Sequence, residues 1–198
     1  MKKSSVSPET ALETLKAGNS RFVTGRVEHP HSDHGRVQTL SREGQAPIAA
    51  VLGCSDSRVP VELIFDQGFG DVFVIRAAGQ VAGTDQLGSV EYAVEHLGVP
   101  LVVVLGHTDC GAVKAAVGGE KAPGALGQLL ARLDPVVAEV KDVPEDRRVA
   151  AAIEKNVDHI IKELRAGGPA LAAAEKAGQV LLIGAVYHLD SGKVEFRN

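Results

Sequence analysis

The chain has 198 residues, 44% of them hydrophobic and 23% charged, which excludes a disordered, collagen-like or disulfide-scaffold protein. The length predicts one domain that spans residues 1–198. A formal net charge of −4 without a basic run argues against a nucleic-acid partner, and no stretch of about 18 apolar residues is present to span a membrane.

The first predicted elements are a helix and a polar arm. The helix begins at Ser7, a favourable N-cap, with Pro8 in its first turn, and it is expected to end near Gly18-Asn19. Residues 24–47 are polar and predict an extended arm or a long loop. Because residues 1–40 have too little apolar content to pack on their own chain, we expect this N-terminal arm to pack on a partner subunit.

Four short, β-branched apolar runs follow, and their continuous character is typical of strands buried on both faces of a parallel sheet. These runs are residues 48–53, 72–75, 101–105 and 180–183. Apolar side chains at helical spacing predict helices over residues 84–97, 145–166 and 126–140, the last broken at Pro135. Residues 186–196 predict a hairpin. The expected architecture is an α/β domain with a mostly parallel four-stranded sheet, an antiparallel edge strand, helices on both faces and an N-terminal helical arm.

Two of the predicted strands end in residues that carry chemistry. Cys54 follows the first strand, and His107 and Cys110 follow the third. Ligand sites form at the carboxyl ends of parallel strands, and two neighbouring strands would place these ends about 5 Å apart. Two thiolates and one imidazole suit Zn²⁺, and three protein ligands leave one coordination position open, as in catalytic zinc sites.

The residues beside the first cysteine fit a catalytic site. Asp56 can accept a hydrogen bond from a hydroxide on the metal, and Arg58 can hold the Asp56 carboxylate with two hydrogen bonds. Asp56 could instead serve as a fourth ligand and close the site. Structural zinc, a disulfide and two buried thiols without a metal are the other interpretations, although sparse cysteines in a chain expected to be cytoplasmic argue against a disulfide. That location is expected because no apolar signal segment follows the N-terminal lysines.

Residues 54–60 and 106–111 resemble the paired motifs of the β-class carbonic anhydrases, and the resemblance extends over roughly residues 7–197. It implies reversible, zinc-dependent hydration of CO₂ to bicarbonate and a proton by attack of zinc-bound hydroxide, the activity of a carbonate dehydratase, which is a zinc lyase. The implied site consists of the zinc ligands Cys54, His107 and Cys110 and the catalytic residues Asp56 and Arg58.

The resemblance also implies a small pocket for CO₂ and bicarbonate. Its substrate-binding residues would be Gln45, Phe73, Ala78 and Tyr92, with Tyr92 supplied by the partner in a homodimer, alone or within a tetramer. Ala77 stands where many members carry Asn, and Ala78 stands where valine is common. Hydrolysis of COS or CS₂ is therefore an alternative reaction, and a zinc-containing regulatory module without turnover is an alternative of another class.

One subgroup of this family has an accessory bicarbonate site that uses a Trp three residues before the first zinc-binding cysteine, and that favours closure of the site by the aspartate. The corresponding residue here is Val51, and the chain contains no Trp. A valine side chain has no N–H group to donate to an anion. We therefore expect Asp56 to stay paired with Arg58 near neutral pH.

Overall fold

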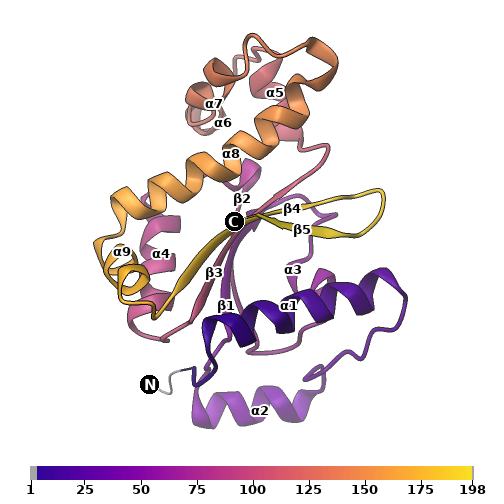
Figure 1. Cartoon of the computed structure of the whole chain (residues 1–198), viewed down its shortest axis with the longest axis vertical. Helices are drawn as coiled ribbons and strands as arrows, with labels where there is room; N and C mark the ends of the chain where they lie inside the picture. The colour runs from indigo at the N-terminus through magenta and orange to yellow at the C-terminus, as the bar shows by residue number, and fades with distance from the viewer. Residues whose placement is uncertain (1–3, 198) are drawn as a thin grey trace.

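A five-stranded sheet lies at the centre of the computed structural model, which describes residues 4–197 (Figure 1). Its strands are β1 (Ala49–Cys54), β2 (Val72–Ala77), β3 (Leu101–His107), β4 (Leu181–Tyr187) and β5 (Val194–Arg197). Their order is β2-β1-β3-β4-β5, in which the first four strands are parallel and β5 pairs antiparallel with β4. The predicted parallel sheet with an antiparallel edge strand is confirmed.

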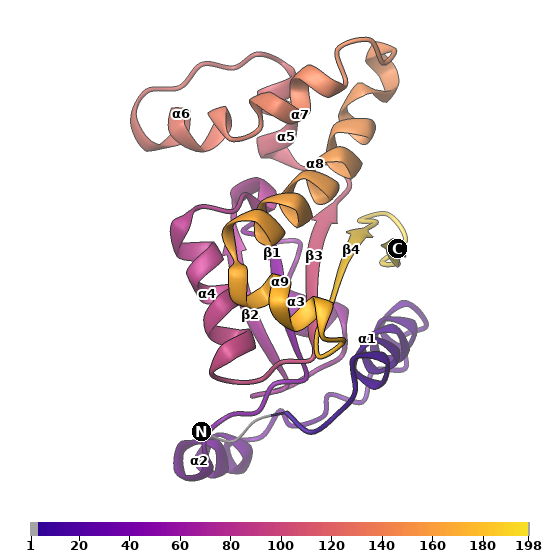
Figure 2. The same ribbon diagram turned by 60° about the vertical axis from the view of Figure 1, so that its left-hand side comes forward.

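Helices cover both faces of this sheet. They are α1 (Pro8–Val23), α2 (His34–Glu43), α3 (Val61–Ile64), α4 (Thr84–Glu95), α5 (Gly111–Val117), α6 (Gly124–Ala131), α7 (Asp134–Glu139), α8 (Glu145–Gly167) and α9 (Pro169–Lys176), and a 3₁₀ turn, η1 (Ala78–Gln80), follows β2. Figure 2 shows α1 on the opposite side of the sheet from α4, α8 and α9. Among residues 4–197, none of these helices combines the length and the apolar character that a membrane crossing requires.

Burial on both faces explains why the strand sequences do not alternate. Ala50 and Leu52 of β1 point into the core under α4 and α8, whereas Ala49 and Val51 point into the core under α1, and all four are fully buried. Each residue of a central strand therefore contacts an apolar layer, as in parallel sheets generally.

The longer predicted helices are confirmed, and a break occurs where proline requires it. Residues 84–95 and 145–167 are helical, and the segment expected over residues 126–140 divides into α6 and α7, with Pro135 in the first turn of α7. A proline is tolerated there because the first N–H groups of a helix have no intrahelical acceptor. The shorter helices α3, α5 and α9 were not predicted.

The expected end of the first helix is wrong, because Gly18-Asn19 lies inside α1. A Cβ atom at Gly18 would lie 1.8 Å from the Phe65 carbonyl oxygen, so glycine allows α1 to approach the chain that follows α3. The buried Asn19 side chain donates to the Gly192 carbonyl and accepts from the Val194 N–H, at 2.9 Å in each case. Both residues serve long-range packing.

The premise that the N-terminal arm cannot pack on its own chain is also wrong. Ala11 and Leu15 of α1 are fully buried against the sheet, and removing a buried leucine side chain costs about 2–5 kcal/mol. The polar segment 24–47 likewise contains a helix, α2, whose N-terminus is capped by the Asp33 carboxylate. No residue of α2 is buried, and Val37 and Leu40 alone are too few apolar side chains to predict a helix from the sequence. Packing of residues 1–40 on a partner subunit stays a prediction.

Candidate metal centre

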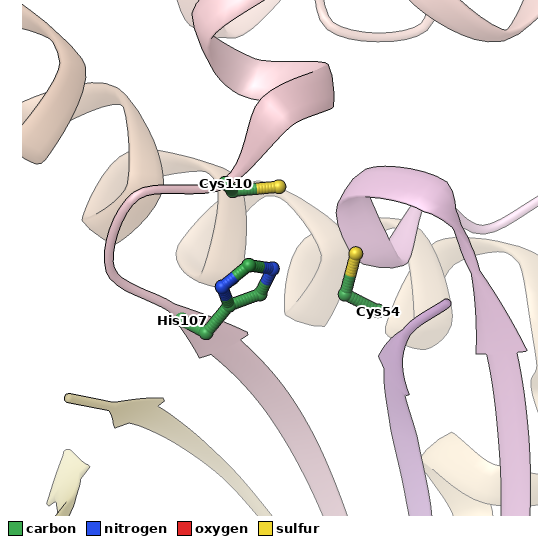
Figure 3. A group of neighbouring side chains, drawn as sticks. All are labelled: Cys54, His107 and Cys110. Atoms are coloured by element: carbon green, nitrogen blue, oxygen red, sulfur yellow. The ribbon is translucent and has the colours of Figure 1, made fainter. Parts of the chain in front are cut away.

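The sheet order brings the two cysteines and the histidine together. Strands β1 and β3 are parallel neighbours, with Gly53 opposite Leu105, so Cys54 and His107 both lie at the carboxyl edge of the sheet. Asp109 adopts a left-handed conformation, with φ of 62°, in the turn that leads to Cys110 at the start of α5. Figure 3 shows the three side chains pointing toward a common space, and their ligand atoms lie within 4.8 Å of one another.

The hydrogen bonding of His107 leaves one nitrogen available to a metal. Its Nδ1 lies 2.8 Å from the Thr108 carbonyl oxygen, which can only accept, so Nδ1 carries the proton. The lone pair is therefore on Nε2. This atom is buried and has no hydrogen-bond partner among residues 4–197. A buried nitrogen acceptor that faces two thiol groups fits a metal ligand and is costly otherwise.

The surroundings of Cys54 stabilise a thiolate. A hydrogen bond from Cys110 is the largest of several contributions that outweigh burial and lower the pKa of Cys54 to about 4. The backbone N–H groups of Asp56 and Gly79 also donate to Cys54 Sγ, at 3.4 and 3.3 Å. The thiolate form, which is the form that binds metals, is therefore favoured at neutral pH.

Cys110 is influenced in the opposite direction. Its hydrogen bond to Cys54, together with burial, raises the pKa of the Cys110 thiol, although the N–H groups of Val113 and Ala112 act against this. Two buried thiolates side by side repel each other, and a cation between them removes that repulsion. Both cysteines are free thiols. Two sulfur atoms and one imidazole nitrogen form a donor set that a divalent zinc ion fits.

Asp56 and Arg58 form a close ion pair beside these ligands. The Arg58 guanidinium donates to the two Asp56 oxygens at 3.0 and 2.8 Å, and the Arg58 backbone N–H donates at 2.9 Å. These hydrogen bonds lower the pKa of Asp56 to about 2. Asp56 Oδ2 lies 3.9 Å from His107 Nε2. Val51 is fully buried in the core under α1, and the expectation drawn from it, that Asp56 stays paired with Arg58 near neutral pH, stays a prediction.

Arg58 has a second carboxylate partner to which the sequence reasoning gave no role. Its Nη1 donates to Asp109 Oδ2 at 3.1 Å, and the ammonium group of Lys114 contacts the same carboxylate from α5. Arg76 was missed as well, and it donates to the Cys54 and Asp56 carbonyl oxygens at 2.9 and 2.7 Å. The position of Asp109 between two candidate ligands was the available signal for its role.

The four predicted pocket residues lie in two places. Ala78 is beside the metal centre, next to Gly79, whose N–H contacts Cys54. Phe73 precedes Ala77, the residue opposite Cys54, by four positions, or about 13 Å along β2. Its ring centroid lies 6.1 Å from that of Tyr92.

Tyr92 in turn shares a surface cavity of about 630 Å³ with Gln45. Gln45 precedes β1, whereas Cys54 is the last residue of that strand. From its first residue, Ala49, to Cys54 the strand extends about 17 Å. Gln45, Phe73 and Tyr92, hereafter the pocket group, are therefore apart from the metal ligands of their own chain.

Comparison with known proteins agrees with the motifs and the fold. The family model described as "Carbonic anhydrase" matches residues 49–194. A carbonic anhydrase from Mycolicibacterium smegmatis is 41% identical over 195 residues, which cover 96% of this chain and 94% of the relative.

Two solved structures have the same fold. The β-carbonic anhydrase CcaA superposes with a TM-score of 0.77 at 28% identity, covering 94% of this chain and 95% of that one. One of two tetrameric β-carbonic anhydrases from Sordaria macrospora superposes with a TM-score of 0.75 at 27% identity, covering 95% of this chain and 96% of that one. The chain belongs to the β-class carbonic anhydrase family, enzymes that catalyse the hydration of CO₂.

Proposed function

We propose that the enzyme is zinc-dependent and that Cys54, His107 and Cys110 hold the ion. The observation that carries this proposal is the buried, unpartnered Nε2 of His107, within 4.8 Å of two thiol sulfur atoms. Sulfur and imidazole ligands in a set of three favour zinc with one open position. When bound, zinc lowers the pKa of water to about 7 and so supplies hydroxide at neutral pH.

Asp56 orients the nucleophile in this proposal. Because its pKa is about 2, the carboxylate is ionised at neutral pH and can only accept hydrogen bonds. A hydroxyl group that donates a hydrogen bond to Asp56 turns a lone pair toward the carbon of CO₂. Arg58 holds both Asp56 oxygens, and Asp109 holds Arg58, so the carboxylate is kept in place.

We propose further that the pocket group completes the site of a second copy of the chain. Gln45 and Tyr92 are exposed, and β2, which carries Phe73, is an edge strand with one free side. A two-fold dimer can bring both metal centres to the partner's pocket groups. The Sordaria macrospora relatives are tetrameric, and two such dimers can assemble into a tetramer.

Each member of the pocket then has a defined task. The Gln45 amide donates a hydrogen bond to an oxygen of bicarbonate, while Phe73, Tyr92 and Ala78 form apolar walls of a size suited to CO₂. The proton released in the reaction leaves through water and buffer. Free thiols in the metal-binding set also suit the reducing cytoplasm, the compartment we propose for the enzyme.

Metal analysis and a stopped-flow CO₂ hydration assay on the same sample test the proposal. We expect close to one zinc per chain, loss of activity on chelation and recovery with added zinc. A fully active preparation without zinc would contradict the metal assignment. A zinc-loaded preparation that hydrates no CO₂ would contradict the proposed mechanism.

A further inference from the structure

The long helix α8 packs unusually close to the sheet beside the metal centre. It lies across β3 and β4 (Figure 2). A Cβ atom at Gly106 or Gly184 would lie 2.7 or 2.6 Å from the Val157 side chain. Glycine at these two strand positions therefore allows α8 to approach the backbone that leads to His107.

Asn156, the neighbour of Val157 on α8, is a polar residue in an apolar environment. Its side chain has no exposure to solvent, and α8 buries Ile153, Val157 and Ile160 around it. Burial of an amide is costly unless the amide makes hydrogen bonds. Asn156 Nδ2 donates to the Gly79 carbonyl oxygen at 2.8 Å, whereas Oδ1 has no partner among residues 4–197.

The segment that receives this hydrogen bond is strained and contacts a metal ligand. Gly79 and Gln80 both adopt left-handed conformations, with φ of 67° and 42°, and Gln80 is not a glycine. Such a conformation persists where surrounding contacts impose it. At the other side of Gly79, its N–H group donates to Cys54 Sγ at 3.3 Å. One residue thus connects α8 to a sulfur of the metal centre.

We propose that Asn156 is a positioning residue for the metal centre, which acts by holding Gly79 so that its N–H group points at Cys54 Sγ. The inference rests on the proposed zinc site. Asn156 touches neither substrate nor metal, and it acts through one residue, Gly79, whose carbonyl and N–H groups belong to two adjacent peptide units. Groups that orient a ligand from outside the coordination sphere commonly change metal affinity by 10–100-fold.

The test compares Asn156→Leu, which keeps the branched shape of asparagine but has larger terminal groups and no donor, with the control Ile160→Ala on the same buried stripe of α8. Three quantities are measured for each: the zinc dissociation constant by competition with a chelator, the thiolate-to-metal absorption of the Co²⁺ form, and the melting temperature. We expect Asn156→Leu to bind zinc about tenfold more weakly than the parent and to show a shifted Co²⁺ absorption. Ile160→Ala should lower the melting temperature while both metal readouts stay at the parent values.

The proposal is overturned if Asn156→Leu lowers only the melting temperature and keeps the parent's zinc affinity and Co²⁺ spectrum. If this variant does not fold, Asn156→Ala removes the same donor without adding volume and is judged by the same two metal readouts. Failure of the zinc site itself is seen separately, because the parent chain would then bind zinc weakly or show no thiolate-to-cobalt absorption.

Discussion

The metal centre and the pocket group differ in how far one chain organises them. Cys54, His107 and Cys110 are 4%, 0% and 1% exposed, and hydrogen bonds to the backbone fix the orientation of their side chains. Tyr92 is 41% exposed, and Gln45 is an exposed residue that precedes β1. A single chain thus prepares its metal ligands and leaves its pocket group open.

This difference has a physical origin in the place of each group in the sheet. The ligands lie at or just beyond the carboxyl ends of β1 and β3, which have neighbours on both sides. In the pocket group, Phe73 is on the edge strand β2, Tyr92 is on α4, and Gln45 precedes β1. Central strands fix the positions of their ends through hydrogen bonds on both sides. An edge strand keeps one side free for another chain.

Loss of a metal ligand should have the largest effect. In Cys110→Ser the thiolate is replaced by a hydroxyl group, a poor zinc ligand, so we expect loss of bound zinc and a decrease of more than about 1,000-fold in CO₂ hydration. Metal analysis and stopped-flow kinetics measure both. Ser55→Ala, an exposed neighbour of Cys54, is the control that should keep zinc and activity. Full zinc occupancy in Cys110→Ser would show that the ligand is wrongly assigned.

Loss of the orienting carboxylate should reduce turnover and leave the metal in place. We expect Asp56→Ala to retain zinc and to lose about 100-fold or more in kcat, because its hydrogen bond positions the nucleophile. Metal content and kcat are measured on one preparation. A metal-free Asp56→Ala protein would mean that Asp56 is itself a structural ligand.

The convergence of the ligands could be predicted because parallel strands that are neighbours end at the same edge of a sheet. The sequence suggested this arrangement only on the condition that the first and third strands are adjacent, and the order β2-β1-β3 satisfies that condition. The role of Asn156 could not be predicted. Asn156 lies 77 positions from Gly79 in the sequence, and local spacing carries no signal of that contact.

The two errors in the N-terminal region have different causes. Gly18 and Asn19 have the local character of a helix end, yet their contacts with Phe65, Gly192 and Val194 keep them within α1. The helix α2 has no buried side chain, so its helical conformation depends on capping and on its neighbours. Tertiary contacts thus override the local preference in α1, whereas in α2 the Asp33 cap supports a helix that has no buried side chain.

A hybrid dimer can show directly whether the pocket group acts on the partner's metal centre. One protomer carries His107→Ala, and the other carries Gln45→Ala together with Tyr92→Ala. Each variant alone should be strongly impaired. If the pocket group acts across the dimer, the hybrid has one complete site of two and should recover about half of the parent activity.

The hybrid is isolated with two different affinity tags and is assayed by stopped-flow hydration of CO₂. The parent chain purified with both tags is the control. Activity no higher than that of the Gln45→Ala/Tyr92→Ala homodimer would place the pocket group in the site of its own chain and would overturn the proposed arrangement.

Releasing residues 24–45 from Asp66 should have the smallest effect, and it should act on the pocket group alone. Asp66 is buried, accepts hydrogen bonds from the Glu28 and His29 N–H groups at 3.0 and 2.9 Å, and pairs with Arg21 at 2.5 Å. Burial raises the pKa of Asp66, but these hydrogen bonds and the Arg21 charge outweigh it, so the pKa is lowered. The ionised carboxylate therefore fastens the chain that leads to α2 and Gln45.

A lowered pKa fixes the direction of the pH dependence. The stabilisation by Asp66 is complete above the unfolded-state pKa of about 3.9 and is lost as the pH falls through the lower pKa of the folded state. Acidification below about pH 4 should therefore weaken the protection of residues 24–45 against hydrogen–deuterium exchange, measured relative to an unstructured peptide at the same pH. Asp66→Asn, which cannot ionise, should show raised exchange there at neutral pH, a few-fold weaker dimer and the zinc affinity of the parent. Unchanged exchange in residues 24–45 of Asp66→Asn would show that Asp66 does not hold this segment. Reduced zinc affinity would show that this segment and the metal centre are not independent.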